Sequence, residues 1–125
     1  MTIDQTVNGQ EKPIQDKGSY YLIKVEPPIR SHGFKIEYAI KKLAQRPKET
    51  LLDLNNIHIM RWDDAQVILA LNNIAMDANM SLSLVNPKPN VKCYLENNPQ
   101  TKGIISIFQN EQHYQKARNP EYQDV

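Results

Sequence analysis

The adjacent carboxylates Asp63 and Asp64 come closest, by type and spacing, to a chemical site in this sequence. Two carboxylates share acid–base work only when a cleft gives them separated environments. Here they stand at the start of a long apolar helical pattern, where Asp63 is a natural N-cap and Gln66, three residues later, can complete a capping box. We therefore interpret the pair first as helix-capping groups. A second role in recognition stays open, because this end of the helix is expected to be exposed.

Trp62 directly precedes this expected helix start and has two interpretations. Either its ring folds back over the edge of the core, or it stands out as a contact anchor. Tryptophan is enriched among the residues that dominate binding energy at protein interfaces, so the second interpretation remains open. The candidate partner-binding residues are Arg61, Trp62, Asp63, Asp64 and Gln66.

The remaining reactive side chains form no recognisable site. The histidines His32, His58 and His113 are scattered without metal-ligand spacing. Cys93 has no sequence signal of an activating histidine and is interpreted as an inert thiol. The four glycines are too far apart for a phosphate-binding loop or a dinucleotide fingerprint. No catalytic residue, metal site or cofactor is therefore expected.

The composition is that of one ordinary globular domain. The 125 residues include fifteen basic and fourteen acidic side chains, a formal net charge of +1. Domains that bind nucleic acid usually carry a basic excess, so no nucleic-acid partner is expected. One basic cluster is interpreted as a solvated helix face, with a functional patch as the alternative: Lys35, Lys41, Lys42, Arg46 and Lys48.

The sequence also favours a cytoplasmic location. Cys93 is the only cysteine, which excludes an internal disulfide and fits a reducing compartment. Residues 1–17 lack the apolar core of a signal peptide. No stretch approaches the roughly 20 apolar residues that a membrane-spanning helix needs.

The chain is expected to contain one domain, residues 18–118, between flexible tails at 1–17 and 119–125. Strands are predicted at 20–25, 50–54, 81–85 and 103–108, and residues 29–33 are left open as a short edge strand or a loop. Helices are predicted around Ile36 to Leu43, over 63–80, around Val91 to Leu95, and over 110–118. Strands that alternate with helices predict a mixed, mainly parallel sheet of four to five strands with helices packed against it.

Two segments, 51–71 and 81–91, resemble the STAS domain family of anti-sigma-factor antagonists and sulfate-transporter-like proteins. Leu52-Asp53-Leu54 matches the strand end of the family pattern, and Val85-Asn86-Pro87 with Val91 matches its later proline-containing turn and helix. The similarity extends over residues 20–108. It implies the STAS-like fold and a protein-binding role.

The chain departs from the family at the turn before the long helix. Where the family has Asp-Ser-Ser-Gly, this sequence has Arg61-Trp62-Asp63-Asp64, so that Trp62 and Asp63 fall on the two serine positions. The first of those serines is the usual phosphorylation site in partner-switching members. The nearest hydroxyl groups in the sequence belong to Thr50 and Ser81. A kinase acting at this turn has no residue to modify, although Asp63 partly imitates a phosphorylated surface under one interpretation.

The function expected from the sequence is therefore regulation by partner binding, without enzymatic activity. The implied partner is an anti-sigma-factor-type kinase, a related STAS protein or a transporter subunit, and a homodimer is left open. The alternative function is a domain that senses a small ligand, such as a nucleotide or a lipid, or an accessory STAS subunit of a transporter.

Overall fold

The structure, a computed structural model, describes residues 13–119 and arranges them as five strands and four helices. The strands are β1 (Ile14–Asp16), β2 (Tyr20–Lys24), β3 (Glu49–Asp53), β4 (Leu82–Val85) and β5 (Ser106–Phe108). They lie side by side in chain order within one sheet. β1 pairs antiparallel with β2, and each later pair is parallel. The predicted mixed, mainly parallel α/β fold is confirmed.

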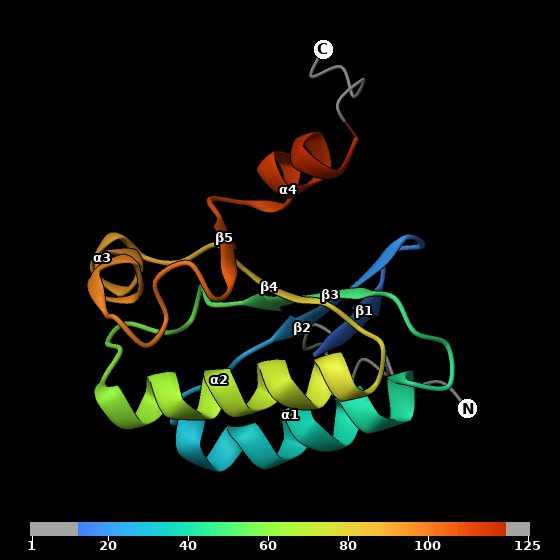
Figure 1. Cartoon of the computed structure of the whole chain (residues 1–125), viewed down its shortest axis with the longest axis horizontal. Coiled ribbons are helices and arrows are strands. Elements are labelled where there is room, and N and C mark those ends of the chain that lie inside the picture. Colours follow the sequence, from blue (N-terminus) through green and yellow to red (C-terminus); the bar gives the residue numbers. More distant parts are fainter. Residues whose placement is uncertain (1–12, 120–125) are drawn as a thin grey trace, which may run out of the picture.

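The helices lie on both faces of this sheet. They are α1 (Ile29–Leu43), α2 (Trp62–Asp77), α3 (Pro89–Asn97) and α4 (Glu111–Arg118). α1 and α2 run next to each other below the sheet in the view of Figure 1, whereas α4 lies above it. No helix within residues 13–119 combines the length and the apolar character needed to cross a bilayer.

Side chains that alternate along the strands build two cores, one on each face. The larger core lies between the sheet and the helices α1 and α2. Its strand residues are those that face these helices, including Tyr21, Ile23, Leu52, Leu82 and Leu84. The alternate strand residues face the other side of the sheet and pack against α4. This smaller core consists of Tyr20, Leu22, Leu51, Val85 and Tyr114. β3 contributes to both cores, and its Leu51 and Leu52 are completely buried.

α4 is attached to the sheet by aromatic rings and by hydrogen bonds at the ring edges. The Tyr114 ring lies edge-on to Tyr20 and to Phe108, with ring centroids 5.0 and 5.5 Å apart. The Tyr114 hydroxyl donates to the Glu49 carboxylate, and the Tyr20 hydroxyl donates to Glu111 Oε1 at 2.6 Å. Burial, followed by the hydrogen bond to Glu111, raises the pKa of Tyr20 to about 12. The polar terminal helix predicted from the sequence therefore closes the second core.

The predicted flexible tail is wrong for Ile14–Asp16, which forms β1. Ile14 pairs with Ile23 and packs against the larger core, and Asp16 Oδ1 accepts a hydrogen bond from Lys48 Nζ at 2.7 Å. A strand of three residues is too short for its periodicity to be seen in the sequence. The predicted tail residues 1–12 and 120–125 lie outside the described residues.

Two further element predictions need correction. Residues 29–33, left open as an edge strand or a loop, form the first turns of α1. The strand predicted over 103–108 is shortened to Ser106–Phe108, because the chain turns at Gly103, where φ is +74°. The other predicted strands and helices are confirmed within a few residues at their ends.

α1 and α2 approach each other closely at Gly33. A Cβ atom at this position would lie 2.7 Å from Cγ1 of Val67, on α2. A valine methyl group cannot swing away at low cost, because its branched Cβ restricts χ1 in a helix. Glycine is therefore needed at position 33 for interhelical contact, although it is a poor helix former.

Gly33→Ala should lower the free energy of unfolding by about 1 kcal/mol, since overpacking outweighs the gain in helix propensity. Val67→Ala makes room for the added methyl group. The double variant should therefore be more stable than the sum of the two single effects by about 1 kcal/mol. Urea unfolding of the four proteins measures this coupling. A Gly33→Ala protein that is more stable than the parent would contradict the packing described here.

Candidate functional site

The loops that follow β2 and β3 meet at one edge of the sheet, because the two strands are parallel. Residues 25–28 lead from β2 into α1, and residues 54–61 lead from β3 into α2. The Val25 N–H donates to the Asp53 carbonyl at 3.0 Å, so the first loop starts directly beside the second. In open α/β sheets, binding sites usually form beyond the carboxyl ends of the strands.

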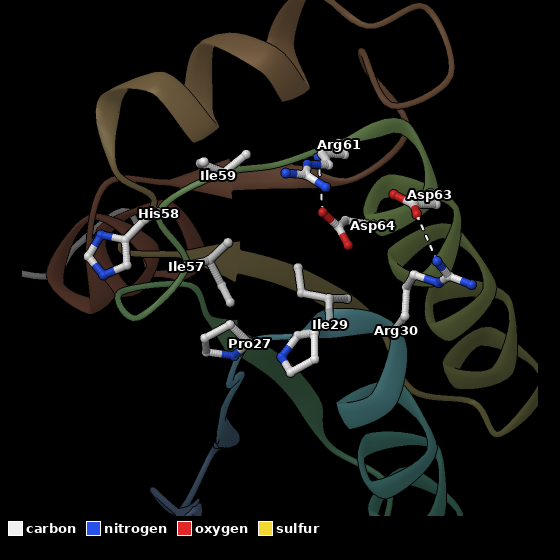
Figure 2. Close-up of a pocket in the computed structure, with 10 residues that line it drawn as sticks. Pro27, Ile29, Arg30, Ile57, His58, Ile59, Arg61, Asp63 and Asp64 are labelled. Atoms are coloured by element: carbon white, nitrogen blue, oxygen red, sulfur yellow. Dashed lines mark hydrogen bonds and ion pairs between the residues drawn. The ribbon is translucent and has the colours of Figure 1, made fainter.

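A pocket of about 410 Å³ opens between these two loops and the first turns of α1 and α2. In Figure 2, Pro27, Ile29 and Ile57 lie together along one part of the pocket, and Arg61 and Asp64 lie across from them. The complete lining consists of Pro27, Pro28, Ile29, Arg30, Ile57, His58, Ile59, Arg61, Asp63 and Asp64.

A buried carboxylate fixes the start of the β3–α2 loop. Asp53 is 8% exposed, and its Oδ1 accepts hydrogen bonds from the Asn55 N–H at 2.9 Å and from Asn86 Nδ2 at 3.1 Å. Asn86 follows β4 and has a φ of +58°, a conformation that asparagine tolerates better than most residues. The aspartate of the Leu52-Asp53-Leu54 motif therefore ties the end of β3 to the turn after β4.

Two side-chain amides hold the same loop from either side. Asn56 Nδ2 donates to Glu26 Oε2 at 3.0 Å, which links it to the turn after β2. Asn90 Nδ2, in the first turn of α3, donates to the His58 carbonyl at 2.6 Å. The loop is thus connected to both neighbouring crossovers, and it presents its last residues at the start of α2.

α2 begins one residue earlier than the sequence predicts, and Asp63 is not its N-cap. Arg61 occupies the cap position with extended backbone, and Trp62 is the first helical residue. Asp64, at the third helical position, accepts a hydrogen bond from the Arg61 N–H through Oδ2 at 3.0 Å. This is the reach-back half of a capping box; an arginine side chain has no acceptor to supply the other half.

Gln66 does not take part in that cap. Its side-chain amide makes a hydrogen bond with Gln100, in the segment between α3 and β5. The prediction that Gln66 completes the capping box is therefore wrong, because the shift of the helix start puts Asp64 at the position from which a side chain reaches the cap.

Asp63 instead pairs with Arg30, on the first turn of α1. Arg30 Nη1 lies 3.3 Å from Asp63 Oδ2; the Arg30 side chain is largely exposed, and that of Asp63 is partly exposed. Figure 2 shows this pair at the edge of the pocket, away from the apolar side chains. An exposed pair of this kind stabilises the fold very little, but it places a guanidinium group directly against the Asp63 charge.

Two large apolar side chains at this edge are exposed to solvent. Trp62 and Ile59 are each 61% exposed. The Trp62 ring therefore stands out from the surface and does not fold back over the edge of the core. Buried aromatic and aliphatic groups of this size dominate interfaces, so both side chains are free to be covered by a partner.

The pocket is lined by apolar, basic, acidic and imidazole side chains. None of the described lining residues carries a hydroxyl or thiol group, so the pocket offers no serine, threonine or cysteine nucleophile. Both of its carboxylates already engage groups of the protein. Within residues 13–119 there is no group of three histidine, cysteine, aspartate or glutamate side chains able to hold a metal ion.

Arg30, His58 and Ile59 were not among the residues predicted for this site. Arg30 was missed because residues 29–33 were not assigned to a helix. The apolar spacing of Ile36 and Ile40 continues backwards to Gly33 and Ile29, and this signal would have extended the helix to the double proline.

Asp64→Ala should lower the free energy of unfolding by about 1 kcal/mol, because it removes the side chain that caps α2. Asp63→Ala should change it by less than about 0.5 kcal/mol, since it removes an exposed ion pair. Chemical denaturation of the matched variants compares the two carboxylates. A larger loss for Asp63→Ala would restore Asp63 as the capping residue.

His32 connects α1 to the loop that follows β2. Its Nδ1 accepts a hydrogen bond from the Glu26 N–H at 3.0 Å, which requires that nitrogen to be unprotonated. Burial lowers the pKa of His32; the Glu26 charge opposes this effect and Lys35 adds to it.

Acidification should therefore destabilise the protein through His32. A lowered pKa in the folded state means that the unfolded chain binds the proton more readily, so the stabilisation is present above the unfolded pKa of about 6.5 and is lost as the pH falls below it. His32→Gln should reduce the change in unfolding free energy between about pH 7 and pH 5. NMR titration of His32 gives a direct check, and a midpoint at or above about 6.5 would refute the assignment.

Comparison with known proteins identifies the fold. No protein-family model matches the sequence, and no curated protein matches it. A chain of the stressosome, a signal integration and transduction hub, matches at 19% identity with a TM-score of 0.66, over 89% of this chain and 100% of the other. A Thermotoga maritima protein described as a candidate anti-sigma factor antagonist matches at 14% identity with a TM-score of 0.65, over 86% of this chain and 94% of the other.

A third solved structure carries the family's name. It is an anti-sigma-factor antagonist (STAS) domain protein from Planctomyces limnophilus, at 12% identity and a TM-score of 0.62, over 83% of this chain and 94% of the other. All three structures are matched over nearly their full length. The chain accordingly has the STAS domain fold, the fold of the anti-sigma-factor antagonists that its sequence resembles.

Proposed function

We propose that this chain is a non-enzymatic regulatory module that binds another protein through the surface at the start of α2. That surface consists of Arg61, Trp62, Asp63, Asp64 and Gln66. The observation that carries the proposal is the 61% exposure of Trp62 on the first residue of α2. Covering an exposed tryptophan ring with a partner removes a large apolar surface from water, and this burial favours binding.

The solved structures of the same fold support a regulatory role. They include a component of a signal integration hub and an anti-sigma-factor antagonist (STAS) domain protein. The partner that we propose is accordingly an anti-sigma-factor-type kinase, a related STAS protein or a transporter subunit, and the cytoplasm is the proposed location. The pocket's lack of a nucleophile and of a free carboxylate supports binding in preference to catalysis.

We further infer that this module works without a phosphorylation switch at the start of α2. Residues 61–64 contain no hydroxyl group. Asp63 carries one negative charge, against about −1.5 to −2 for phosphoserine, and Arg30 compensates that charge from 3.3 Å away. A partner selected by Trp62 and Arg61 fits this arrangement better than one that reads a phosphate-like charge.

A small ligand is the second candidate occupant of this site. The pocket of about 410 Å³ is within the usual size range of small-molecule sites. Its lining combines apolar groups with two guanidinium groups and two carboxylates, which suits a ligand with an apolar body and a polar end. A thermal-shift screen of nucleotides and lipids tests this alternative, because a ligand that binds the folded state raises the melting temperature.

Trp62→Ala should weaken partner binding by about 2 kcal/mol or more, roughly a 30-fold rise in the dissociation constant, as the loss of an aromatic anchor does. Its effect on folding should be smaller, since the side chain is already in solvent. The partner is first captured with the parent chain and identified, and its affinity is then measured by calorimetry against both proteins.

Met76→Ala is the matched control, because Met76 is 60% exposed at the other end of α2. It should leave the affinity unchanged. Equal binding by the parent, Trp62→Ala and Met76→Ala would show that the partner uses another surface. Equal loss in both variants would show that the effect is not specific to the start of the helix.

A further inference from the structure

The outward face of α1 carries two aromatic rings in solvent. Phe34 is 76% exposed and Tyr38 is 65% exposed. They stand four residues apart, so they lie on the same side of the helix. The buried side of α1 uses other positions, among them Ile36 and Ile40. A helix face that only meets water is expected to be polar, and the surface proposed above for partner binding leaves this face unused.

Basic side chains surround the two rings. Glu37 is the single acidic residue of α1, and Lys41 Nζ already pairs with it at 2.9 Å. Lys42 Nζ lies 5.3 Å from the centre of the Tyr38 ring. Within residues 13–119, neither Lys35 nor Lys42 forms an ion pair with a carboxylate. The complete basic–aromatic face of α1 consists of Arg30, Phe34, Lys35, Tyr38, Lys41 and Lys42.

This concentration of charge is a property of the face and not of the whole chain. The formal net charge of the protein is only +1. The Asp63 carboxylate compensates Arg30 at one end of the face, and the remaining cations lie further along α1. The molecule is therefore polarised, with an excess of positive charge along one helix.

We propose that the basic–aromatic face of α1 docks the protein on an anionic lipid surface. Lysine is depleted at protein–protein interfaces, whereas lysines that flank exposed aromatic rings suit the boundary between headgroups and acyl chains. The two rings are largely exposed to solvent, which suits insertion into a soft surface. From Arg30 to Lys42 the face extends for about 18 Å, so α1 would lie flat on the membrane.

The arrangement of the layers permits this contact. Figure 1 shows α1 along one outer edge of the molecule, with α4 on the opposite side of the sheet. A plane laid against the outward face of α1 therefore meets that helix before it meets α4. Docking would bury Phe34 and Tyr38 without disturbing either core, because neither ring belongs to them.

Co-sedimentation with lipid vesicles tests the proposal on the full chain alone, so its outcome does not depend on the protein partner. The probes are vesicles of phosphatidylcholine and vesicles of phosphatidylcholine with phosphatidylglycerol in about a 2:1 ratio. Binding is expected only to the anionic vesicles. It should weaken steeply as the salt concentration rises from about 0.1 M to about 0.5 M, because salt screens the attraction.

Two double variants separate the charges from the rings. Lys35→Gln/Lys42→Gln should lower the vesicle partition coefficient about 30-fold, since each basic residue near an anionic surface contributes about a factor of five. Phe34→Ser/Tyr38→Ser should lower it at least about tenfold by removing the inserted groups. Circular dichroism and thermal melting establish that each variant is folded.

Each double variant has a matched control elsewhere on the surface. Lys88→Gln/Lys102→Gln removes the same net charge, and Met76→Ser/Ile104→Ser removes apolar groups that are 60% and 58% exposed. Both controls should bind like the parent. Equal loss in a variant and its control would overturn the proposal, and so would equal binding to both kinds of vesicle or to neither. Binding of a short single-stranded oligouridine with no vesicle binding would also overturn it, and would assign the face to nucleic acid.

Discussion

The parallel pairing of β3 on both of its sides is the constraint on which the rest of the molecule depends. A strand paired in this way has no exposed edge, and its two faces need separate cover. In β3 the two faces are represented by Leu51 and Leu52, both completely buried. α1 and α2 cover one face, and Tyr114 of α4 helps to cover the other. The same pairing brings the carboxyl ends of β2, β3 and β4 to one edge, where the following loops lead into α1, α2 and α3. The candidate site lies between the first two of these loops.

Long apolar patterns were predictable from the sequence, and short or displaced features were not. The stripe of α1 and the alternation of β4 are long enough to show their period, and both are found where predicted. β1 was not predicted, because three residues are too few to show a hydrophobic period and the strand is stabilised by its pairing with β2. Pro27 and Pro28 concealed the first turns of α1, since prolines usually mark an interruption of the chain, whereas here they stand directly before a helix.

The candidate site was predictable as a location but not as a set of contacts. The residues from Arg61 to Asp64 do lie together at the start of a helix. Which side chains cap that helix depends on where its first turn begins. The N-cap lies at Arg61, two residues before Asp63, so the side chain that reaches back to the cap is that of Asp64 and not that of Gln66. The ion pair to Arg30 joins residues 33 positions apart in the chain. Only the fold brings such residues together, so no local sequence pattern predicts this ion pair. With both carboxylates engaged inside the protein, Trp62 and Ile59 are the large exposed apolar groups of this edge.

The absence of a side chain at Gly33 has a mechanical consequence. With no methylene group between them there, α1 and α2 are set in register at one point, about one turn from the start of each helix. Neither helix can slide along the other without driving Val67 into the backbone of its neighbour. Val67 stands five residues after Trp62 on α2, and Phe34 directly follows Gly33 on α1. The proposed partner-binding surface and the basic–aromatic face therefore lie on two helices that are fixed against each other at Gly33.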